Sequence, residues 1–260
     1  MSALAGLREA LRRETLRGLA ATRYFTRLRI PGRTDHTRHA LEGAVRYLPL
    51  VGALVGASGA TVYVTARVVL PAVVAVLLSM AATVIITGAL HEDGLADAAD
   101  GLGGGLNRER ALEIMKDPHI GAFGATSLML ALLLKVNLLI ALPSARMPAA
   151  LIAGHALSRL AAVCVVMALP YVRDERDSRS KPLVTDVSRA SLAVAAVTGL
   201  APLALVGRSA LVGLGCVVVA GFLWRTYLRH RLGGCTGDCL GAAQQLSEIA
   251  FYLGVDVSVP

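Results

Sequence analysis

The segment from His91 to Gly101 carries four acidic residues directly after a long apolar run. On a helix, Asp93, Asp97 and Asp100 stand at positions i, i+4 and i+7, so the spacing predicts three carboxylates on one face. Carboxylates this close repel one another unless a cation lies between them, and Mg²⁺ prefers oxygen ligands of this kind. We therefore predict a Mg²⁺ site formed by these three aspartates, together with a phosphate-bearing substrate. A solvated acidic helix end is the alternative.

Polar residues on both sides of this segment extend the predicted site. His91 is the candidate general base, or the group that orients one carboxylate, although a histidine at the end of a membrane span is often only an interfacial residue. Further along, Asn107 is expected to cap a short helix that ends near Lys116 and Asp117. Asp117 is predicted as a further catalytic carboxylate and Lys116 as a phosphate contact. A helix stop with a solvated charge pair is the alternative for both.

The composition is that of a membrane protein. Of the 260 residues, 55% are hydrophobic and 17% are charged, below the roughly 25% charged residues of soluble domains. The predicted fold class is therefore all-α, a polytopic integral membrane helical bundle with about six or seven transmembrane helices of roughly 20 residues each. The expected spans are 44–67, 68–90, 121–142, 147–169, 192–206 and 211–224. The segment 240–257 either spans as a seventh, lies in the interface or packs as a half-buried helix.

The N-terminal residues differ from the rest of the chain. Leu4, Leu7 and Leu11 recur at helical spacing among several arginines, which predicts a basic amphipathic helix on the membrane surface. A disordered basic tail is the alternative, and no apolar stretch of signal-peptide length follows the arginines. We therefore expect a cytoplasmic basic segment over 1–42 and a single transmembrane catalytic domain over 43–260.

The basic residues indicate an orientation in the membrane. Of the 26 Lys and Arg residues, nine lie in residues 1–42, three in 91–120, five in 171–189 and three in 225–241, whereas the intervening turns carry one each. The positive-inside rule then places the N-terminus and the loops 91–120, 171–189 and 228–241 in the cytoplasm. Basic loops against anionic lipid account for the charge, so membrane lipids are expected partners and nucleic acid is not.

Three further residues are predicted to contact substrate. Lys181 lies in a basic loop and Asp238 in a Gly-rich turn, and both fall on the predicted side of the aspartates. Arg159 lies inside an apolar span, one turn after His155, and charges at such depth usually face the bundle interior, a partner or a wet cavity. The alternatives are an ordinary basic loop for Lys181 and, for Arg159, a pairing with Glu248 or a carbonyl that fixes helix packing.

Several motifs, in chain order, resemble the cobalamin synthase family, also called adenosylcobinamide-GDP ribazoletransferases. They are the segments 26–31, 91–103, 110–124, 181–184 and 233–242. Together they extend over nearly the whole chain, whereas none of them is specific alone. The pattern Asp97-Ala-Ala-Asp100-Gly101 is also similar to the CDP-alcohol phosphotransferases, but Gly103 and its neighbours stand where that family continues with an Ala-Arg pair.

The resemblance implies an integral enzyme of the bacterial cytoplasmic (inner) membrane that requires Mg²⁺. It would transfer the adenosylcobinamide-phosphate group of adenosylcobinamide-GDP to α-ribazole or α-ribazole 5′-phosphate and release GMP, in the last steps of adenosylcobalamin biosynthesis. Two other hypotheses stay open. They are a phospholipid-type phosphotransferase that uses a CDP-alcohol, and a transporter or membrane-complex subunit without a nucleotide substrate. A homo-oligomer is compatible with the sequence.

Overall fold

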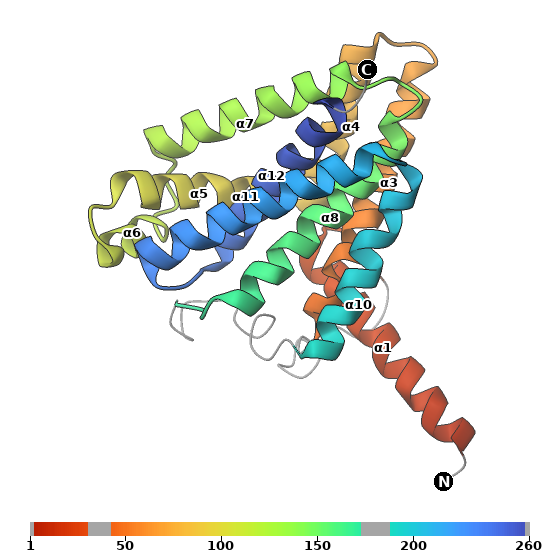
Figure 1. Ribbon diagram of the computed structural model, residues 1–260, viewed down its shortest axis with the longest axis horizontal. Coiled ribbons are helices and arrows are strands. Elements are labelled where there is room, and N and C mark those ends of the chain that lie inside the picture. Colours follow the sequence, from red (N-terminus) through yellow and green to blue (C-terminus); the bar gives the residue numbers. More distant parts are fainter. Residues whose placement is uncertain (1–2, 31–42, 173–187, 258–260) are drawn as a thin grey trace.

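The described residues fold almost wholly into helices. The computed structural model describes residues 3–30, 43–172 and 188–257. The elements in chain order are α1 (Ala3–Phe25), η1 (Ala44–Tyr47), α3 (Leu48–Arg67), α4 (Ala72–Thr87), α5 (Leu90–Gly104), α6 (Arg108–Ile114), α7 (Ala122–Ala141), α8 (Met147–Ala168), α10 (Arg189–Leu200), η3 (Ala201–Leu205), α11 (Ser209–Leu232) and α12 (Gly237–Val257). The predicted all-α fold class is confirmed (Figure 1).

Fewer helices than predicted are long and apolar enough to cross a membrane. Within the described ranges, four qualify by length and composition: η1 with α3, α7, α8 and α11. Helices α4 and α5 meet at an 86° bend and would be a fifth if the pair forms one span. The predicted count of about six or seven is not confirmed. The expected span 192–206 is divided into the short α10 and η3, and α12 carries the polar side chains of Gln244, Gln245 and Glu248.

Helix α8 lies at the centre of the bundle. In its most apolar stretch 83% of the residues are buried, compared with 22% for α7 and 17% for α11. Its contact with α3 is close because Gly52 and Gly56 have no side chains, and a Cβ at either position would overlap the backbone of α8 at His155 or Leu151. Small residues at such a crossing let two helix backbones approach each other. The sequence pattern of spaced glycines therefore has a packing role.

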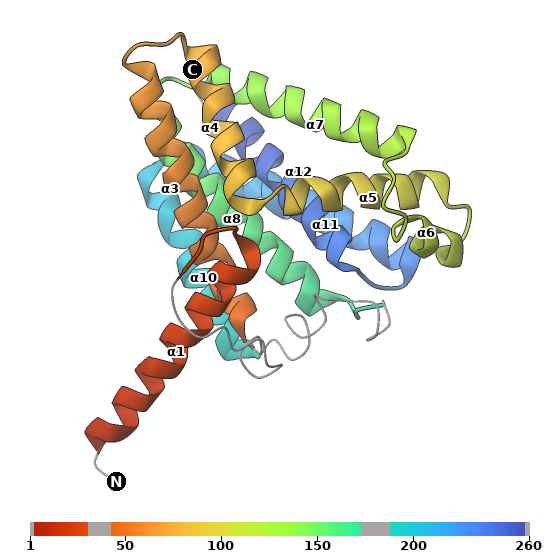
Figure 2. The same ribbon diagram turned by 180° about the vertical axis from the view of Figure 1, so that it is seen from behind.

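The C-terminal half of α1 joins the bundle. Ala21 is fully buried in a cluster with Val51 and Val55 of α3. The N-terminal half of α1 extends away from the other helices (Figures 1 and 2), and Leu7 and Leu11 on that half are 58% and 60% exposed. The structure thus has a helix where an amphipathic one was expected, while its place on a membrane surface stays a prediction.

The connections between helices gather at two opposite ends of the bundle. The α3–α4, α7–α8 and η3–α11 connections lie at the end that also holds the C-terminus, whereas α6 and the α11–α12 connection lie at the other end (Figures 1 and 2). Arg67, Arg146 and Arg208 belong to the first group, whereas the second group includes Arg108, Arg110, Arg229 and Arg231. This separation agrees with the charge pattern, while the orientation in the membrane stays a prediction.

Candidate active site

A sharp turn of the chain sets the direction of the helix that carries the aspartates. Between α4 and α5, Gly88 and Ala89 both have positive φ, at 68° and 60°. This left-handed conformation costs Ala89 roughly 1–2 kcal/mol, and a hydrogen bond from its N–H to the carbonyl of Val84 (3.0 Å) holds it in place. The Arg27 side chain packs over Gly88, where a Cβ would overlap it. As a result, α5 leaves α4 at 86° and lies against α12 and α7.

The three aspartates of α5 have different surroundings, although the predicted helix is confirmed. Asp93 is exposed and Asp97 is partly buried. Asp100 is 8% exposed, and its two carboxylate oxygens accept hydrogen bonds from the N–H groups of Gly121 (2.7 Å) and Gly124 (2.8 Å). Both N–H groups belong to the start of α7, where a helix leaves its first donors unpaired. Asp100 therefore caps α7, a role that the spacing did not predict.

The C-terminal end of α5 is closed by α6 and α11. Helix α6 begins after Asn107, whose side chain accepts a hydrogen bond from the N–H of Arg110 (2.9 Å), so the predicted cap is confirmed. From α11, the guanidinium of Arg231 donates to the carbonyls of Leu102 (2.9 Å) and Gly105 (2.7 Å). These carbonyls lie at the end of α5, where a cation also interacts favourably with the helix dipole.

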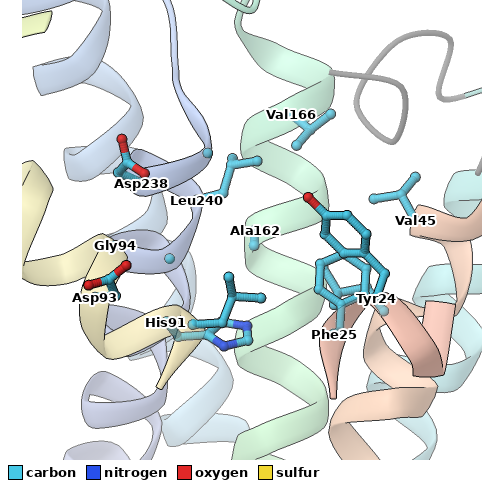
Figure 3. A pocket seen from close by; sticks show the side chains of 14 residues that line it. Tyr24, Phe25, Val45, His91, Asp93, Gly94, Ala162, Val166, Asp238 and Leu240 are labelled. Carbon is cyan, nitrogen blue, oxygen red and sulfur yellow. The ribbon is translucent and has the colours of Figure 1, made fainter. Parts of the chain in front are cut away.

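A pocket of about 120 Å³ lies between α1, α5, α8 and α12. Figure 3 shows Asp93 and Asp238 on one side of the pocket, Tyr24 and Phe25 on the other, and His91 between them. The His91 ring is 6% exposed, and its Nδ1 has no hydrogen-bond partner within the described part of the chain. Because His91 lines the pocket, its imidazole ring is a candidate to exchange a proton with a ligand.

Two glycines bring Asp93 and Asp238 to the same end of the pocket. A Cβ on Gly94 of α5 would lie 3.1 Å from the Cα of Gly241 and 3.2 Å from the Cα of Asp238, both on α12. Without side chains at this crossing the two backbones touch, and the acidic residues beside it become neighbours. The sequence predicted that Asp238 contacts substrate. Its position near a second carboxylate favours a cation between them instead.

The acidic end of the pocket fits Mg²⁺ as part of a substrate complex. Among the residues that the structure describes, no three His, Cys, Asp or Glu side chains are arranged to hold a metal ion. Mg²⁺ is commonly held by one or two carboxylates together with water and substrate phosphates. Asp93 and Asp238 supply such a pair, and Asp97 lies one turn further along α5. A ligand role for Asp100 competes with its two hydrogen bonds to α7.

A buried network of charged side chains joins α7, α8 and α12. Lys135 forms an ion pair with Glu248 (3.3 Å), which also accepts a hydrogen bond from the hydroxyl of Tyr252 (3.0 Å). Arg159 is 1% exposed and donates to the carbonyl of His155 (3.0 Å). It is not among the residues that line the pocket. This arrangement matches the helix-packing alternative for Arg159, and the geometry gives no support to its predicted contact with substrate.

Glu92 connects α5 to this network. The spacing places it off the aspartate face, and in the structure its Oε1 accepts a hydrogen bond from the amide of Gln245 (2.9 Å). The Gln245 carbonyl oxygen in turn accepts from Lys135 (2.7 Å). The network therefore holds one face of α5 while Asp93 on another face reaches the pocket. In the sequence, the signal for this buried network was the polar pair Gln244-Gln245 in an otherwise apolar helix.

Asp117 and Lys116 lie in the exposed connection between α6 and α7. The Oδ1 of Asp117 accepts hydrogen bonds from the backbone N–H (3.0 Å) and the ring (2.7 Å) of His119, and these lower the pKa of the carboxyl. Neither Asp117 nor Lys116 is among the lining residues of the pocket. Their predicted catalytic and phosphate-binding roles therefore gain no support from the geometry.

The Gly-rich turn lies beside the base of the basic loop. The N–H of Cys235 donates to the carbonyl of Pro170 (2.9 Å), and the N–H of Val172 donates to the carbonyl of Cys235 (3.0 Å). The first residues of the basic loop, 171 and 172, thus lie next to the turn that precedes Asp238. Residues 173–187 of this loop, which include the predicted substrate contact Lys181, lie outside the described residues.

The sequence analysis did not assign the aromatic end of α1 to the site. Tyr24 and Phe25 form an edge-to-face pair with ring centroids 4.9 Å apart, and both line the pocket. A hydrogen bond from the N–H of Arg27 to the carbonyl of Ile86 (2.7 Å) attaches this end of α1 to the end of α4. The sequence did contain a signal for this assignment, because the two aromatic residues directly precede the segment 26–31, one of the motifs that carry the resemblance.

Comparison with known proteins decides the family. The family model described as cobalamin-5-phosphate synthase matches residues 17–255. The chain belongs to the cobalamin-5-phosphate synthase family. As a member of it, the chain is an enzyme of cobalamin biosynthesis.

Several relatives named adenosylcobinamide-GDP ribazoletransferase match over nearly their full length. The chain is 44% identical to that of a Polaromonas species, over 93% of this chain and 96% of the relative. It is 47% identical to that of Leptothrix cholodnii, over 90% and 92%, and 42% identical to that of Vibrio cholerae, over 90% and 91%. No solved structure matches the chain.

Proposed function

We propose that this family member transfers the adenosylcobinamide-phosphate group of adenosylcobinamide-GDP to α-ribazole or α-ribazole 5′-phosphate and releases GMP. The name shared by the relatives supports this activity. The structural observation that carries it is a single pocket in which His91, Asp93 and Asp238 converge from two helices. Phosphoryl transfer to a hydroxyl needs an acceptor for the hydroxyl proton and positive charge near the phosphates. His91 provides the proton acceptor, and the two carboxylates can hold a cation that supplies the positive charge.

The reaction exchanges one bond to phosphorus for another. The ribose hydroxyl oxygen of α-ribazole attacks the phosphorus on the cobinamide side of the pyrophosphate. The new P–O bond forms while the bond from that phosphorus to the bridging oxygen breaks, and the electron pair leaves with GMP. His91, which lines the pocket, accepts the hydroxyl proton on its imidazole ring.

Charge at the acidic end would be balanced by Mg²⁺ held by Asp93 and Asp238. Mg²⁺ held there would supply positive charge that stabilises the leaving phosphate. Asp97, one turn further along α5, stays a predicted third ligand of this ion. The first turn of α12 also lines the pocket, and the positive end of its helix dipole favours a phosphate nearby.

The pocket is proposed to face the cytoplasm of a bacterial inner membrane. Asp238 directly follows the α11–α12 connection, at the end of the bundle that holds the more basic segments. Water-soluble nucleotide substrates would reach this end without crossing the membrane, while four or five spans anchor the enzyme. The basic half of α1, with Leu7 and Leu11 exposed, would rest on the lipid surface.

The test is turnover by the full-length protein reconstituted in nanodiscs. With adenosylcobinamide-GDP, α-ribazole and Mg²⁺, we expect equal amounts of GMP and cobalamin product, and no turnover with a chelator. Asp93→Asn, Asp238→Asn and His91→Asn should each lower kcat/KM by roughly a hundredfold or more. Glu113→Gln, a substitution on the exposed face of α6, is the matched control.

Each part of the proposal has its own contrary result. If the folded wild-type protein makes neither product, the proposed activity is wrong. If it turns over and the Asp93 and Asp238 variants turn over equally well, the activity stands and the metal site does not. A His91→Asn variant with unchanged kcat would remove the proton acceptor from the mechanism.

A further inference from the structure

The pocket has a second end that phosphate chemistry does not explain. Opposite Asp93 and Asp238, its wall is formed by Tyr24 and Phe25 of α1 (Figure 3). Val45, Leu48, Ala162 and Val166 complete this apolar wall. A phosphate or a hydrated metal ion gains nothing from such surroundings. Aromatic side chains beside aliphatic ones are instead typical of sites that stack a planar ring.

The size of the pocket limits what the ring can be. A volume of about 120 Å³ has room for roughly ten groups the size of a water molecule, at about 10–15 Å³ each. The pocket therefore admits a bicyclic base of approximately nine ring atoms, and the rest of the substrate extends beyond it. A corrin macrocycle is several times larger, so the corrinoid has to lie outside the pocket.

Two bicyclic bases are present in the proposed reaction, and the wall discriminates between them. Guanine has an amide and an amino group along its edge, and a polar group buried without a partner weakens binding severalfold to a hundredfold. Among the described residues that line the aromatic end, Tyr24 is the one that carries a polar side-chain atom. A benzimidazole base has a single unsubstituted ring nitrogen and otherwise apolar edges, so this end suits it better than guanine.

We propose that the aromatic end of the pocket binds the benzimidazole base of α-ribazole, between the Tyr24–Phe25 pair and the Ala162–Val166 face of α8. This inference rests on the proposed function and names the substrate that enters the pocket. With the base at this end, the attached ribose lies toward His91, the proton acceptor, and the phosphorus lies toward Asp93. The N-terminal helix is then part of the binding site, in addition to any membrane contact it makes.

The test separates the two substrates by their KM values. Ala162→Val fills the apolar end, and Ala161→Val, one residue earlier on α8 but facing a different groove beside α11, is the matched control. We expect Ala162→Val to raise the KM for α-ribazole about tenfold and to change the KM for adenosylcobinamide-GDP by less than about twofold. The riboside of unsubstituted benzimidazole, which lacks two methyl groups, should be affected less. Ala161→Val should change neither value.

A second variant covers the case in which Ala162→Val does not fold. Phe25→Leu lies at the end of α1 and removes the stacking surface, so it should raise the KM for α-ribazole about tenfold with kcat largely kept. Free dimethylbenzimidazole should inhibit the wild type competitively with α-ribazole, and more weakly in Phe25→Leu.

The outcomes separate this inference from the proposed function. No GMP release by the wild type would defeat the function itself. Normal turnover with only the KM for adenosylcobinamide-GDP raised would place the guanine or corrinoid side at this end, and unchanged KM values for both substrates would show that neither base binds there.

Discussion

Asp100 is the residue for which a helix-cap role and a metal-ligand role predict different measurements. It is 8% exposed and accepts N–H groups from Gly121 at 2.7 Å and Gly124 at 2.8 Å. Asp100→Ala leaves both donors without an acceptor, at roughly 1–3 kcal/mol for each buried group. Water can reach the exposed Gly121 but not the buried Gly124. We therefore expect Asp100→Ala to lower the free energy of unfolding by about 2–4 kcal/mol, and Asp100→Asn, which keeps one acceptor oxygen, by about half as much.

The assay is an SDS unfolding titration of the reconstituted protein, followed by fluorescence of its single tryptophan, Trp224. Gly124→Ala gives an independent perturbation, because a Cβ at that position would overlap the Asp100 carboxylate. The two substitutions remove the same contact, so the Gly124→Ala/Asp100→Ala double variant should be less destabilised than the sum of the single variants. The Mg²⁺ concentration for half-maximal turnover by Asp100→Asn should stay within about twofold of the wild type.

The opposite pattern would refute the helix-cap role. If Asp100→Ala unfolds within about 0.5 kcal/mol of the wild type while Asp100→Asn needs at least tenfold more Mg²⁺, then Asp100 binds metal and its contact with α7 is incidental. Glu113→Gln, on the exposed face of α6, should change neither measurement.

Three further predictions test the packing around the site. Gly94→Ala would place a Cβ 3.0 Å from the α12 backbone. We therefore expect turnover to fall at least tenfold and the free energy of unfolding to fall by about 1–3 kcal/mol. The control Gly215→Ala, with open space around it, should leave turnover unchanged, and a Gly94→Ala variant as active as the wild type would mean that the crossing is not critical. Lys135→Met leaves Glu248 buried without its ion-pair partner and should lower the free energy of unfolding by about 3–5 kcal/mol. Adding Glu248→Gln should recover part of that loss in the same SDS titration, whereas strictly additive losses would show that the pair is not coupled. Burial raises the pKa of the Cys235 thiol to about 12, so its thiolate fraction at pH 8 is about 10⁻⁴ and rises with pH. Maleimide should therefore label Cys235 at least a hundredfold more slowly in the folded protein than in SDS. Comparable labelling rates would show that the Gly-rich turn is open.

Local features could be predicted because nearby residues decide them. The helix that carries the aspartates, the Asn107 cap of α6 and the start of α7 after Gly121 all depend on propensities and hydrogen bonds within a turn or two of the chain. The membrane class follows from hydropathy summed over whole helices. The family could be identified because its motifs extend over the chain in order.

The predicted span count is not confirmed, because apolar composition does not say what an apolar helix packs against. Helix α12 has an apolar sequence but is buried inside the bundle around Gln244, Gln245 and Glu248. Helix α4 and the acidic helix α5 form one bent pair, because Gly88 and Ala89 adopt positive φ between them. Hydropathy measures the transfer of a residue from water to an apolar medium. Both a protein interior and a lipid bilayer are such media, so hydropathy does not distinguish between them.

The sequence by itself determined the helices, the membrane class, the family and the helix on which the aspartates lie. Tertiary structure decided which side chains meet. The Gly94–Gly241 crossing brings Asp238 near Asp93, and the start of α7 donates hydrogen bonds to Asp100. The end of α1 adds Tyr24 and Phe25 to the pocket. Spacing along a helix specifies a face but not the element that covers it. The covering element depends on where two helices can approach most closely, and that is set by residues far apart in the chain.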